Sequence, residues 1–339
     1  MERRDRAQWR DLPGGESDHQ IRYWVSSGPA AQTYELTSSP DGGEVLGVEV
    51  RHRLDDGRWC RTYAAPDTMN VRSWGIEPTG HVIHSLDPLH LEPAIDCNLC
   101  ASRGHIRDGH WVEEPARILG LVCTRNEADR YLAEVMAHHW KLCDRILVYD
   151  DRSEDFTALI ATPFADVVVR APDAPSFEQD ESAFRQDAWR AMETALAPTP
   201  ADWVLCFDAD EFLISAAGQS LAELVASAGT ADVVEFPVDE IFDAAVPSRR
   251  VDGFWGSITA KRLARYRPGL TYRPQPLAGG SLPVYPGPTH RTGREWTIRH
   301  FGYARPEDRF AKYQRYRDRV GHNSGHVGSI LWAPTLEPC

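Results

Sequence analysis

The 339-residue sequence predicts an α/β protein in which a mostly parallel sheet is flanked by helices and preceded by a small β-rich domain. From about residue 116, continuous apolar runs alternate with helix-like stretches, the pattern of strands buried on both faces of a parallel sheet. Before residue 116, period-two stretches such as 47–51 and 59–63 stand between Gly- and Asp-rich turn signals, which is typical of short antiparallel strands. We therefore expect two domains, residues 1–115 and 116–339.

The elements expected in the second domain follow one another in strand–helix order. Short continuous apolar runs indicate buried strands, and longer stretches with helical composition indicate the segments that cover them. On this basis strands are expected at 118–123, 146–149, 167–169, 203–207 and 233–238, and helices at 128–141, 181–196, 221–228 and 306–320.

The composition is that of an ordinary globular protein, with 42% hydrophobic and 26% charged residues. No run of about 18 apolar residues predicts a transmembrane helix, and the charged first residues lack the apolar segment of a secretory signal. Seven cysteines are present, and Cys123 and Cys206 lie inside strand-like runs. Reduced thiols in a cytoplasmic protein are the simplest interpretation.

Charge is distributed unevenly along the chain. The net charge is −13, yet residues 244–320 hold 16 Lys and Arg against 5 Asp and Glu, a local charge of +11. Such asymmetry is found where a surface meets phosphates or an acidic partner. A nucleotide diphosphate would account for it equally well, so the composition leaves both interpretations open.

Polar clusters follow three of the expected strands. Residues 125–127 follow the first, Asp150 and Asp151 the second, and Asp208 and Asp210 the fourth. Ligands of parallel α/β sheets bind beyond the carboxyl ends of the strands, so these clusters are expected to share one crevice. An isolated Asp-x-Asp is usually a solvated turn, but carboxylates converging on a crevice can hold Mg²⁺ or Mn²⁺ together with substrate phosphates.

The ordered motifs between about residues 116 and 320 resemble family 2-type glycosyltransferases. They comprise Arg-Asn-Glu at 125–127, Tyr-Asp-Asp-x-Ser-x-Asp at 149–155, Asp-Ala-Asp-Glu-Phe at 208–212, and His-x-Gly-x at 300–303 followed by Phe310 and Lys312. The resemblance implies a GT-A-like, Rossmann-type fold and an inverting transfer from a nucleoside-diphosphate sugar, with a UDP-sugar favoured. The acceptor stays unknown: a glycan, a small molecule or a modified DNA base reached through residues 244–320.

The resemblance also implies roles for individual residues. Metal binding, by Mn²⁺ or Mg²⁺, falls to Asp208 and Asp210, with His300 as a third ligand or a diphosphate contact. Donor binding falls to Arg125, Asn126, Glu127, Asp150 or Asp151, Asp208 and Lys312.

Transfer to a hydroxyl with inversion requires a general base. Asp239 and Glu240 follow the expected strand 233–238, at a place from which a carboxylate could reach the sugar. Glu211 is a further candidate. Each of them could equally be a structural or solvated charge.

The first domain contains Cys97 and Cys100 in a Cys-x₂-Cys spacing, followed by His105. Four Cys or His ligands commonly hold structural Zn²⁺, so zinc is one expectation and a pair of reduced cysteines is the other. The residues around this motif resemble small β domains of actinobacterial and phage proteins.

Two other functions compete with glycosyl transfer. A sugar-phosphate nucleotidyltransferase would use a similar sheet, but no Gly-rich phosphate loop follows the first strand. A polymer-binding protein with weak catalysis, recognising DNA or a cell-wall glycan, would use the basic segment 244–320.

Overall fold

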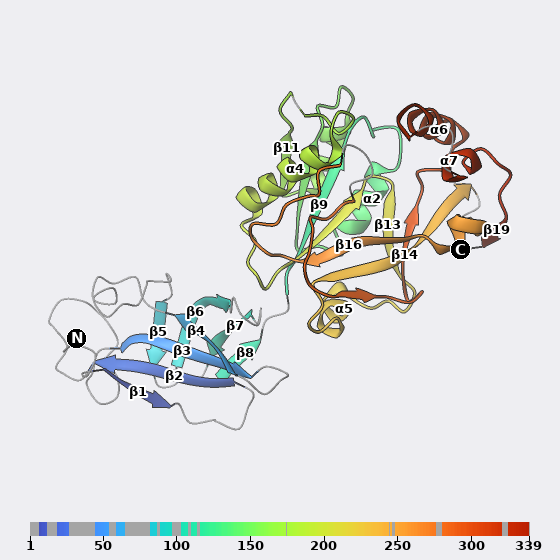
Figure 1. The fold of residues 1–339 in the computed structure, drawn as a ribbon. Helices are drawn as coiled ribbons and strands as arrows, with labels where there is room; N and C mark the ends of the chain where they lie inside the picture. The colour runs from blue at the N-terminus through green and yellow to red at the C-terminus, as the bar shows by residue number, and fades with distance from the viewer. Residues whose placement is uncertain are drawn as a thin grey trace. The chain divides into compact units, whose positions relative to one another are not determined.

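The computed structural model describes residues 116–338 except 174, 244, 246–247, 276–279 and 321–324, together with the backbone of eight strands before residue 116. The chain divides into two compact units (Figure 1). One consists of Met1–Ala116 with Thr199–Ala201, and the other of Arg117–Pro198 with Asp202–Cys339.

The first unit contains two four-stranded antiparallel sheets, in the orders β1-β2-β3-β4 and β5-β6-β7-β8. The two expected strands of this region lie within β3 and β4. The strands are β1 (Ala7–Asp11), β2 (His19–Ser26), β3 (Val45–Arg53), β4 (Trp59–Ala64), β5 (Val82–Leu86), β6 (Leu89–Asp96), β7 (Arg103–Arg107) and β8 (His110–Glu113).

The second unit is built on a mixed sheet whose central strands are parallel, which confirms the expected fold class. Strands β11 (Val167–Arg170), β10 (Arg145–Asp150), β9 (Ile118–Thr124) and β12 (Trp203–Asp208) are parallel neighbours in that order. Strand β16 (Thr259–Arg265) lies antiparallel between β12 and β14 (Val233–Asp243). The carboxyl ends of β9, β10, β12 and β14 therefore face the same edge.

Helices cover both faces of the central strands. On one face, α4 (Glu181–Leu196) packs Phe184, Trp189 and Met192 against alternate residues of β9, β10 and β12. On the other, α2 (Leu132–His139) stacks the ring of His139 on Phe207, 3.8 Å between centroids. Because successive side chains of a strand point to opposite faces of the sheet, each central strand contributes side chains to the core on both faces.

Helix α2 begins four residues later than the sequence pattern predicts. The backbone N–H of Glu127 donates to Thr157 Oγ1 at 2.7 Å, and that of Ala128 donates to Asp155 Oδ2 at 3.1 Å. Because the side chains of Asp155 and Thr157 bind these amides, residues 128–131 do not form the expected first turn of the helix.

Strand β14 is longer than expected, which corrects the placement of Asp239 and Glu240 in a following loop. Residues 233–237 of β14 pair with β16, and 238–240 pair with β18 (Trp296–His300). Both acidic residues lie inside the strand because each has a partner on its own face: Arg294 for Asp239 and His300 for Glu240.

Strand β18 connects β13 and β14. It pairs antiparallel with β13 (Glu211–Ser215) and parallel with β14, so His300 stands in register with both Glu211 and Glu240. The remaining elements are α3 (Thr157–Ala161), η2 (Thr162–Phe164), α5 (Leu221–Ser227), β15 (Ser248–Arg250), η3 (Gly253–Ser257), β17 (Thr289–Arg291), α6 (Pro306–Val320), α7 (Gly325–Ser329) and β19 (Leu336–Pro338). Within the described part of the chain, no helix has the length and apolar character needed to span a bilayer.

Helix α4 has a capping residue whose removal is expected to lower stability without disturbing the core. The Asp180 side chain accepts from the N–H of Ala183 at 3.0 Å. We expect Asp180→Ala to cost about 1 kcal/mol in urea unfolding, and Asp180→Asn to cost much less because Asn caps as well as Asp. Equal losses in both variants would refute the capping role.

Candidate functional site

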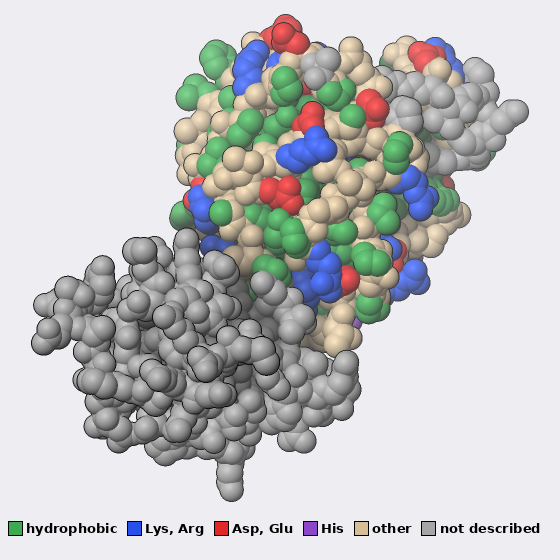
Figure 2. Space-filling view, turned by 60° about the vertical axis from the view of Figure 1, so that its left-hand side comes forward, with side chains coloured by type: hydrophobic (Ala, Val, Ile, Leu, Met, Phe, Trp, Pro, Cys, Tyr) green, Lys and Arg blue, Asp and Glu red, His purple; other side chains and the backbone are tan. Residues whose placement is uncertain are grey.

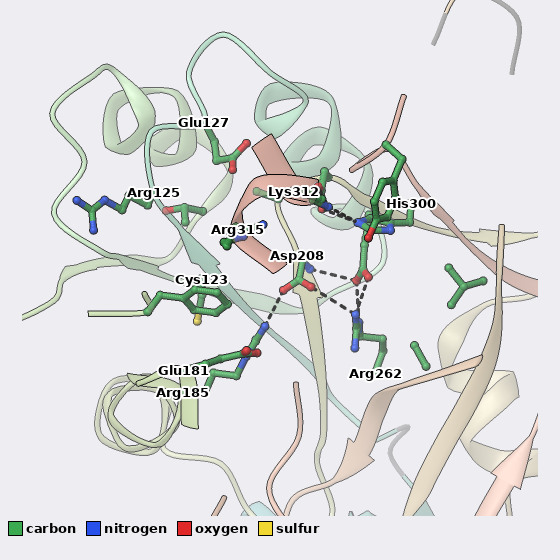
Figure 3. Close-up of a pocket in the computed structure, with 18 of the residues that line it drawn as sticks. Cys123, Arg125, Glu127, Glu181, Arg185, Asp208, Arg262, His300, Lys312 and Arg315 are labelled. Carbon is green, nitrogen blue, oxygen red and sulfur yellow. Dashed lines mark hydrogen bonds and ion pairs between the residues drawn. The ribbon is translucent and has the colours of Figure 1, made fainter. Parts of the chain in front are cut away.

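A cavity of about 590 Å³ opens at the carboxyl ends of β9, β10 and β12 (Figure 3). Figure 3 shows Arg125 on one side, His300 on the other and Asp208 between them. Most of the sequence-predicted residues line it: Arg125, Glu127, Asp151, Asp208, Asp210, Glu211, Glu240, His300 and Lys312.

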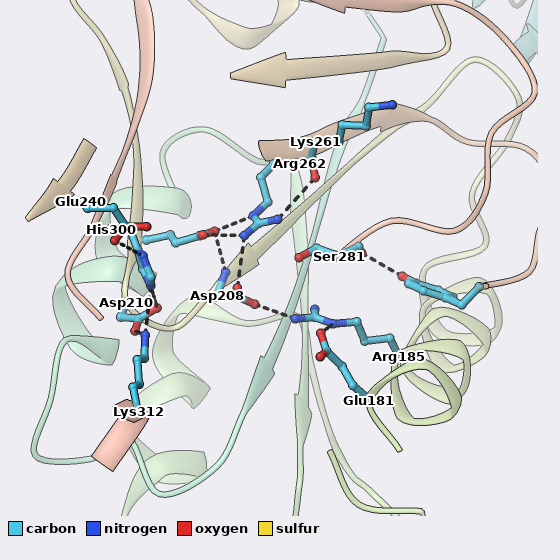
Figure 4. A network of polar contacts seen from close by, with 12 residues as sticks. Glu181, Arg185, Asp208, Asp210, Glu240, Lys261, Arg262, Ser281, His300 and Lys312 are labelled. Atoms are coloured by element: carbon cyan, nitrogen blue, oxygen red, sulfur yellow. Dashed lines mark hydrogen bonds and ion pairs between the residues drawn. The ribbon is translucent and has the colours of Figure 1, made fainter. Parts of the chain in front are cut away.

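Asp208 lies between two arginines that the motifs did not single out (Figure 4). Its Oδ1 accepts from Arg185 at 3.2 Å, and its Oδ2 accepts from Arg262 at 3.3 Å. Arg262 also donates to both oxygens of Glu211, at 2.7 and 2.6 Å, and Arg185 donates to Glu181 at 2.9 Å. Burial raises the pKa of Asp208, but the two arginines outweigh it and hold the pKa below its ordinary value.

A second group forms around Asp210 and His300. His300 Nδ1 donates to Glu240 Oε2 at 2.6 Å, and His300 Nε2 lies 3.5 Å from Asp210 Oδ1. Burial lowers the pKa of His300, but attraction to Glu240 and Asp210 raises it well above its ordinary value. The pKa of Asp210 is correspondingly far below its usual range, because His300 and Lys312 outweigh the effect of burial.

The donor atoms of this group fit a divalent cation that is shared with a substrate. Asp210 and His300 present an oxygen and a nitrogen side by side, and Glu240 orients the ring as a carboxylate behind a metal-binding histidine does. Among the described residues, no group of three or more His, Cys, Asp or Glu side chains is placed to hold a metal ion, so a cation here would have at most two ligands from the protein. Asp208, expected as a ligand, is bound to Arg185 and Arg262 instead. Mg²⁺ and Mn²⁺ sites of this kind complete their coordination with phosphate oxygens and water.

The opposite end of the cavity has a different character. The carboxylate of Asp151 is buried, accepts from the N–H of Phe177 at 3.0 Å and lies 3.6 Å from the guanidinium of Arg125. Phe177 itself lines the cavity, and Arg185 lies over its ring at 5.2 Å. A flat aromatic face beside a fixed carboxylate and an exposed arginine suits a nucleobase and its ribose.

Three predicted residues are not brought to the cavity. Asn126, with φ +52°, donates its N–H to Ser153 Oγ and accepts from the N–H of Glu154. Asp150 is buried and accepts from Ser153. Asp239 binds Arg294 through both oxygens, at 2.7 and 2.8 Å. Asn126 and Asp150 shape the loops at the strand ends because short polar side chains bond readily to nearby backbone.

Glu127 is the least satisfied carboxylate of the cavity. Its Oε1 accepts from Arg130 at 3.1 Å, while its buried Oε2 has no hydrogen-bond partner among the described residues. Burial raises the pKa of Glu127 to about 7 against the opposing effect of Arg130. A carboxyl that titrates near neutral pH beside Lys312 and Asp210 is a candidate for proton-dependent contacts with a ligand.

The expected zinc site lies largely outside the described residues. Cys97 and Cys100 belong to a segment that is not described, and His105 lies in β7, where only the backbone is described. In the second unit, Cys123, Cys143 and Cys206 are free, and burial raises the pKa of Cys206 far above its ordinary value.

Comparisons with known proteins were made at three levels. No protein-family model and no curated protein matches the chain. Among solved structures, it is similar to a mycobacterial protein (19% identity, TM-score 0.27, covering 37% of this chain and 42% of that one). It is also similar to glucosyl-3-phosphoglycerate synthase from Mycobacterium tuberculosis in complex with Mn²⁺, uridine diphosphate and glucosyl-3-phosphoglycerate (20%, TM-score 0.26, 37% and 44%).

A further similar structure is a 4-diphosphocytidyl-2C-methyl-D-erythritol synthase (18%, TM-score 0.30, 45% and 76%). The chain spans less than half of the first two structures, which are covered to 42% and 44%. Similarities with TM-scores of 0.26–0.30 do not indicate an activity. Any inference about function therefore depends on the residues of the cavity.

The Arg262 pairs can be tested by unfolding. Arg262→Met leaves the buried Glu211 without its cation and takes one of two cations from the partly exposed Asp208, and we expect a loss of roughly 3–5 kcal/mol in urea unfolding. Adding Glu211→Gln should recover part of that loss, because one uncompensated charge disappears. Lys261→Met, an exposed neighbour, is the control and should change little. A double variant no more stable than Arg262→Met would contradict the assigned pairing.

Glu127 should make stability depend on pH. An unfolded glutamate loses its proton near pH 4.5, whereas folded Glu127 keeps it up to about pH 7, so its contribution falls as pH rises through that window. We expect Glu127→Gln to raise stability at pH 8 by up to about 3 kcal/mol and to change little at pH 4.5. Melting temperatures across this range, with exposed Glu154→Gln as control, would measure it. A pH-independent difference would rule this titration out.

Proposed function

We propose that this chain is a metal-dependent glycosyltransferase that takes its sugar from a nucleoside-diphosphate sugar, with uridine diphosphate as the favoured carrier. The observation that carries the proposal is the Asp210–His300 pair, oriented by Glu240, at the sheet edge where β9, β10 and β12 end. When bound, Mn²⁺ or Mg²⁺ would neutralise the charge that develops on the departing diphosphate.

The chain supplies its own cations for the same diphosphate. Lys312, Arg130 and Arg315 line the cavity. The Nε atoms of Arg130 and Arg315 are buried and have no hydrogen-bond partner among the described residues. A buried donor without an acceptor is costly, so these nitrogens favour an anion in the cavity.

The contacts of the three candidate bases favour one of them for the proposed reaction. Both oxygens of Glu211 are bound by Arg262, and both oxygens of Asp239 by Arg294 outside the cavity. Glu240 lines the cavity and uses only Oε2 for His300. Glu240 is therefore the best placed of the three to contact an acceptor hydroxyl, in addition to positioning His300.

A nucleotidyltransferase is disfavoured by the loop after β9. Enzymes that cradle a triphosphate there need free backbone N–H groups. Here the amides of Asn126, Glu127 and Ala128 donate to Ser153, Thr157 and Asp155, respectively.

Polymer binding through residues 244–320 is disfavoured by how their charge is used. At least half of the sixteen basic side chains form ion pairs with carboxylates of the described residues: Arg249, Arg250, Arg262, Arg267, Arg291, Arg294, Lys312 and Arg317. The face of the second unit seen in Figure 2 shows basic and acidic side chains interspersed, without a continuous basic stripe.

The proposal is tested by donor binding and hydrolysis. We expect calorimetry to show uridine diphosphate binding with Mn²⁺ and little binding with a chelator. Asp210→Asn should lower the hydrolysis of UDP-sugars by at least roughly 100-fold, because it removes a contact to the metal. Asp239→Asn makes the same chemical change outside the cavity and should retain activity. Chelator-independent binding, or equal losses in both variants, would overturn the proposal.

A further inference from the structure

The ammonium of Lys312 lies in a site that is shaped for a cation. Its Nζ is 3.7 Å from Asp210 Oδ2 and 3.4 Å from His300 Nε2 (Figure 4). It also lies 4.5 Å from the centroid of the Tyr303 ring. A carboxylate and an aromatic face both attract a positive charge. The side chain is only 15% exposed, so these contacts replace most of its hydration.

Gly302 closes this site from the backbone side. A Cβ at residue 302 would lie 1.9 Å from Lys312 Nζ, 2.4 Å from His300 Nε2 and 2.8 Å from Asp210 Oδ2. A side chain at 302 would therefore collide with all three groups at once. The absence of a side chain here is what lets the lysine reach Asp210 and His300.

The lysine lies against the same two side chains that would bind a divalent cation. Asp210 attracts the Lys312 ammonium and His300 lies in contact with it, and these two residues are also the proposed metal ligands. Two cations repel each other strongly at such separations in a poorly hydrated cavity. A divalent ion can therefore bind there only when the ammonium moves away.

Helix α6 is placed so that the side chain can move while the helix stays. Arg130 forms an ion pair with Asp308 at 3.2 Å, and Arg305 donates to the carbonyl of Asp129 at 3.0 Å. These contacts tie the start of α6 to the loop before α2. Lys312 lies further along α6 on a flexible four-carbon stem, and the neighbouring Arg315 also lines the cavity.

We propose that Lys312 is a resident counter-cation that excludes the divalent metal until a nucleotide diphosphate arrives. The diphosphate draws the ammonium onto its own oxygens, which frees Asp210 and His300 for the metal. Metal and donor then bind as a coupled pair, and the free enzyme does not hold a metal ion at an empty donor site. This inference rests on the proposed function.

The coupling predicts an unusual gain on removing a cavity residue. We expect wild-type protein to bind Mn²⁺ alone weakly and to bind it at least roughly tenfold tighter with uridine diphosphate. Lys312→Met should bind Mn²⁺ alone at least roughly tenfold tighter than wild type and show a smaller effect of uridine diphosphate. Electron paramagnetic resonance of free Mn²⁺, or calorimetry, measures these affinities without requiring turnover.

Controls separate displacement from general electrostatics. Arg315→Met removes the same charge from α6 without touching Asp210 or His300, and should change the affinity for Mn²⁺ alone far less than Lys312→Met does. Lys312→Gln, checked by thermal unfolding, guards against a folding defect in the Met variant. No gain in either Lys312 variant, or an equal gain in Arg315→Met, would overturn the inference while leaving the proposed function intact. Failure of wild-type protein to bind Mn²⁺ even with uridine diphosphate would instead reject the proposed function, and this inference with it.

Discussion

The second unit depends on one electrostatic constraint: β12, the turn after it and the start of β13 place the carboxylates of Asp208, Asp210 and Glu211 at one cavity, and Asp210 and Glu211 are buried. A carboxylate left unpaired in such a place costs several kcal/mol. Each neighbouring element therefore brings a cation. Helix α4 brings Arg185, strand β16 brings Arg262, strand β18 brings His300 and helix α6 brings Lys312. These four elements surround the end of β12, and their cations balance the negative charge of the Asp-x-Asp motif.

The cations are not equivalent, and the difference divides the motif into two parts. Arg185 and Arg262 are nearly buried, and each also binds a glutamate, so their contacts to Asp208 are held from both sides. Lys312 contacts Asp210 as a single point charge on a flexible stem. The proposed exchange of one cation for another is therefore easier at Asp210 than at Asp208. The Asp-x-Asp motif combines a fixed, structurally neutralised carboxylate with one whose partner can be replaced.

The sequence predicts the strands well, because strands buried on both faces appear as continuous apolar runs. The motifs also predict that Asp210 and His300 lie at one site, and both line the cavity. Glu240 and Asp239 could not be separated, because the expected strand stopped at 238 and alternation within β14 decides which of them faces the cavity. The position of Arg185 could have been predicted from the sequence. An arginine beside Phe184 and Ala188 on the apolar face of a helix is expected to be buried and therefore to need an acidic partner. Arg262 has no such signal. Its position follows from the antiparallel register of β12 with β16, in which Leu205 pairs with Leu263, and a long-range register is not visible in one sequence.

The excess of basic residues in 244–320 does not produce an equal excess of positive charge in the folded chain. Their charge complements acidic residues from other parts of the second unit, such as Asp208, Asp232 and Glu235, so an imbalance along the sequence becomes local balance in space. Some guanidinium groups of the second unit are incompletely satisfied: the buried Nε atoms of Arg130, Arg299 and Arg315 lack an acceptor among the described residues. Arg130 and Arg315 line the cavity, whereas Arg299 does not. Under the proposed function, the diphosphate of the donor would accept from the donors of Arg130 and Arg315 beside Lys312, and the accompanying cation would balance the carboxylates of Asp210 and Glu240.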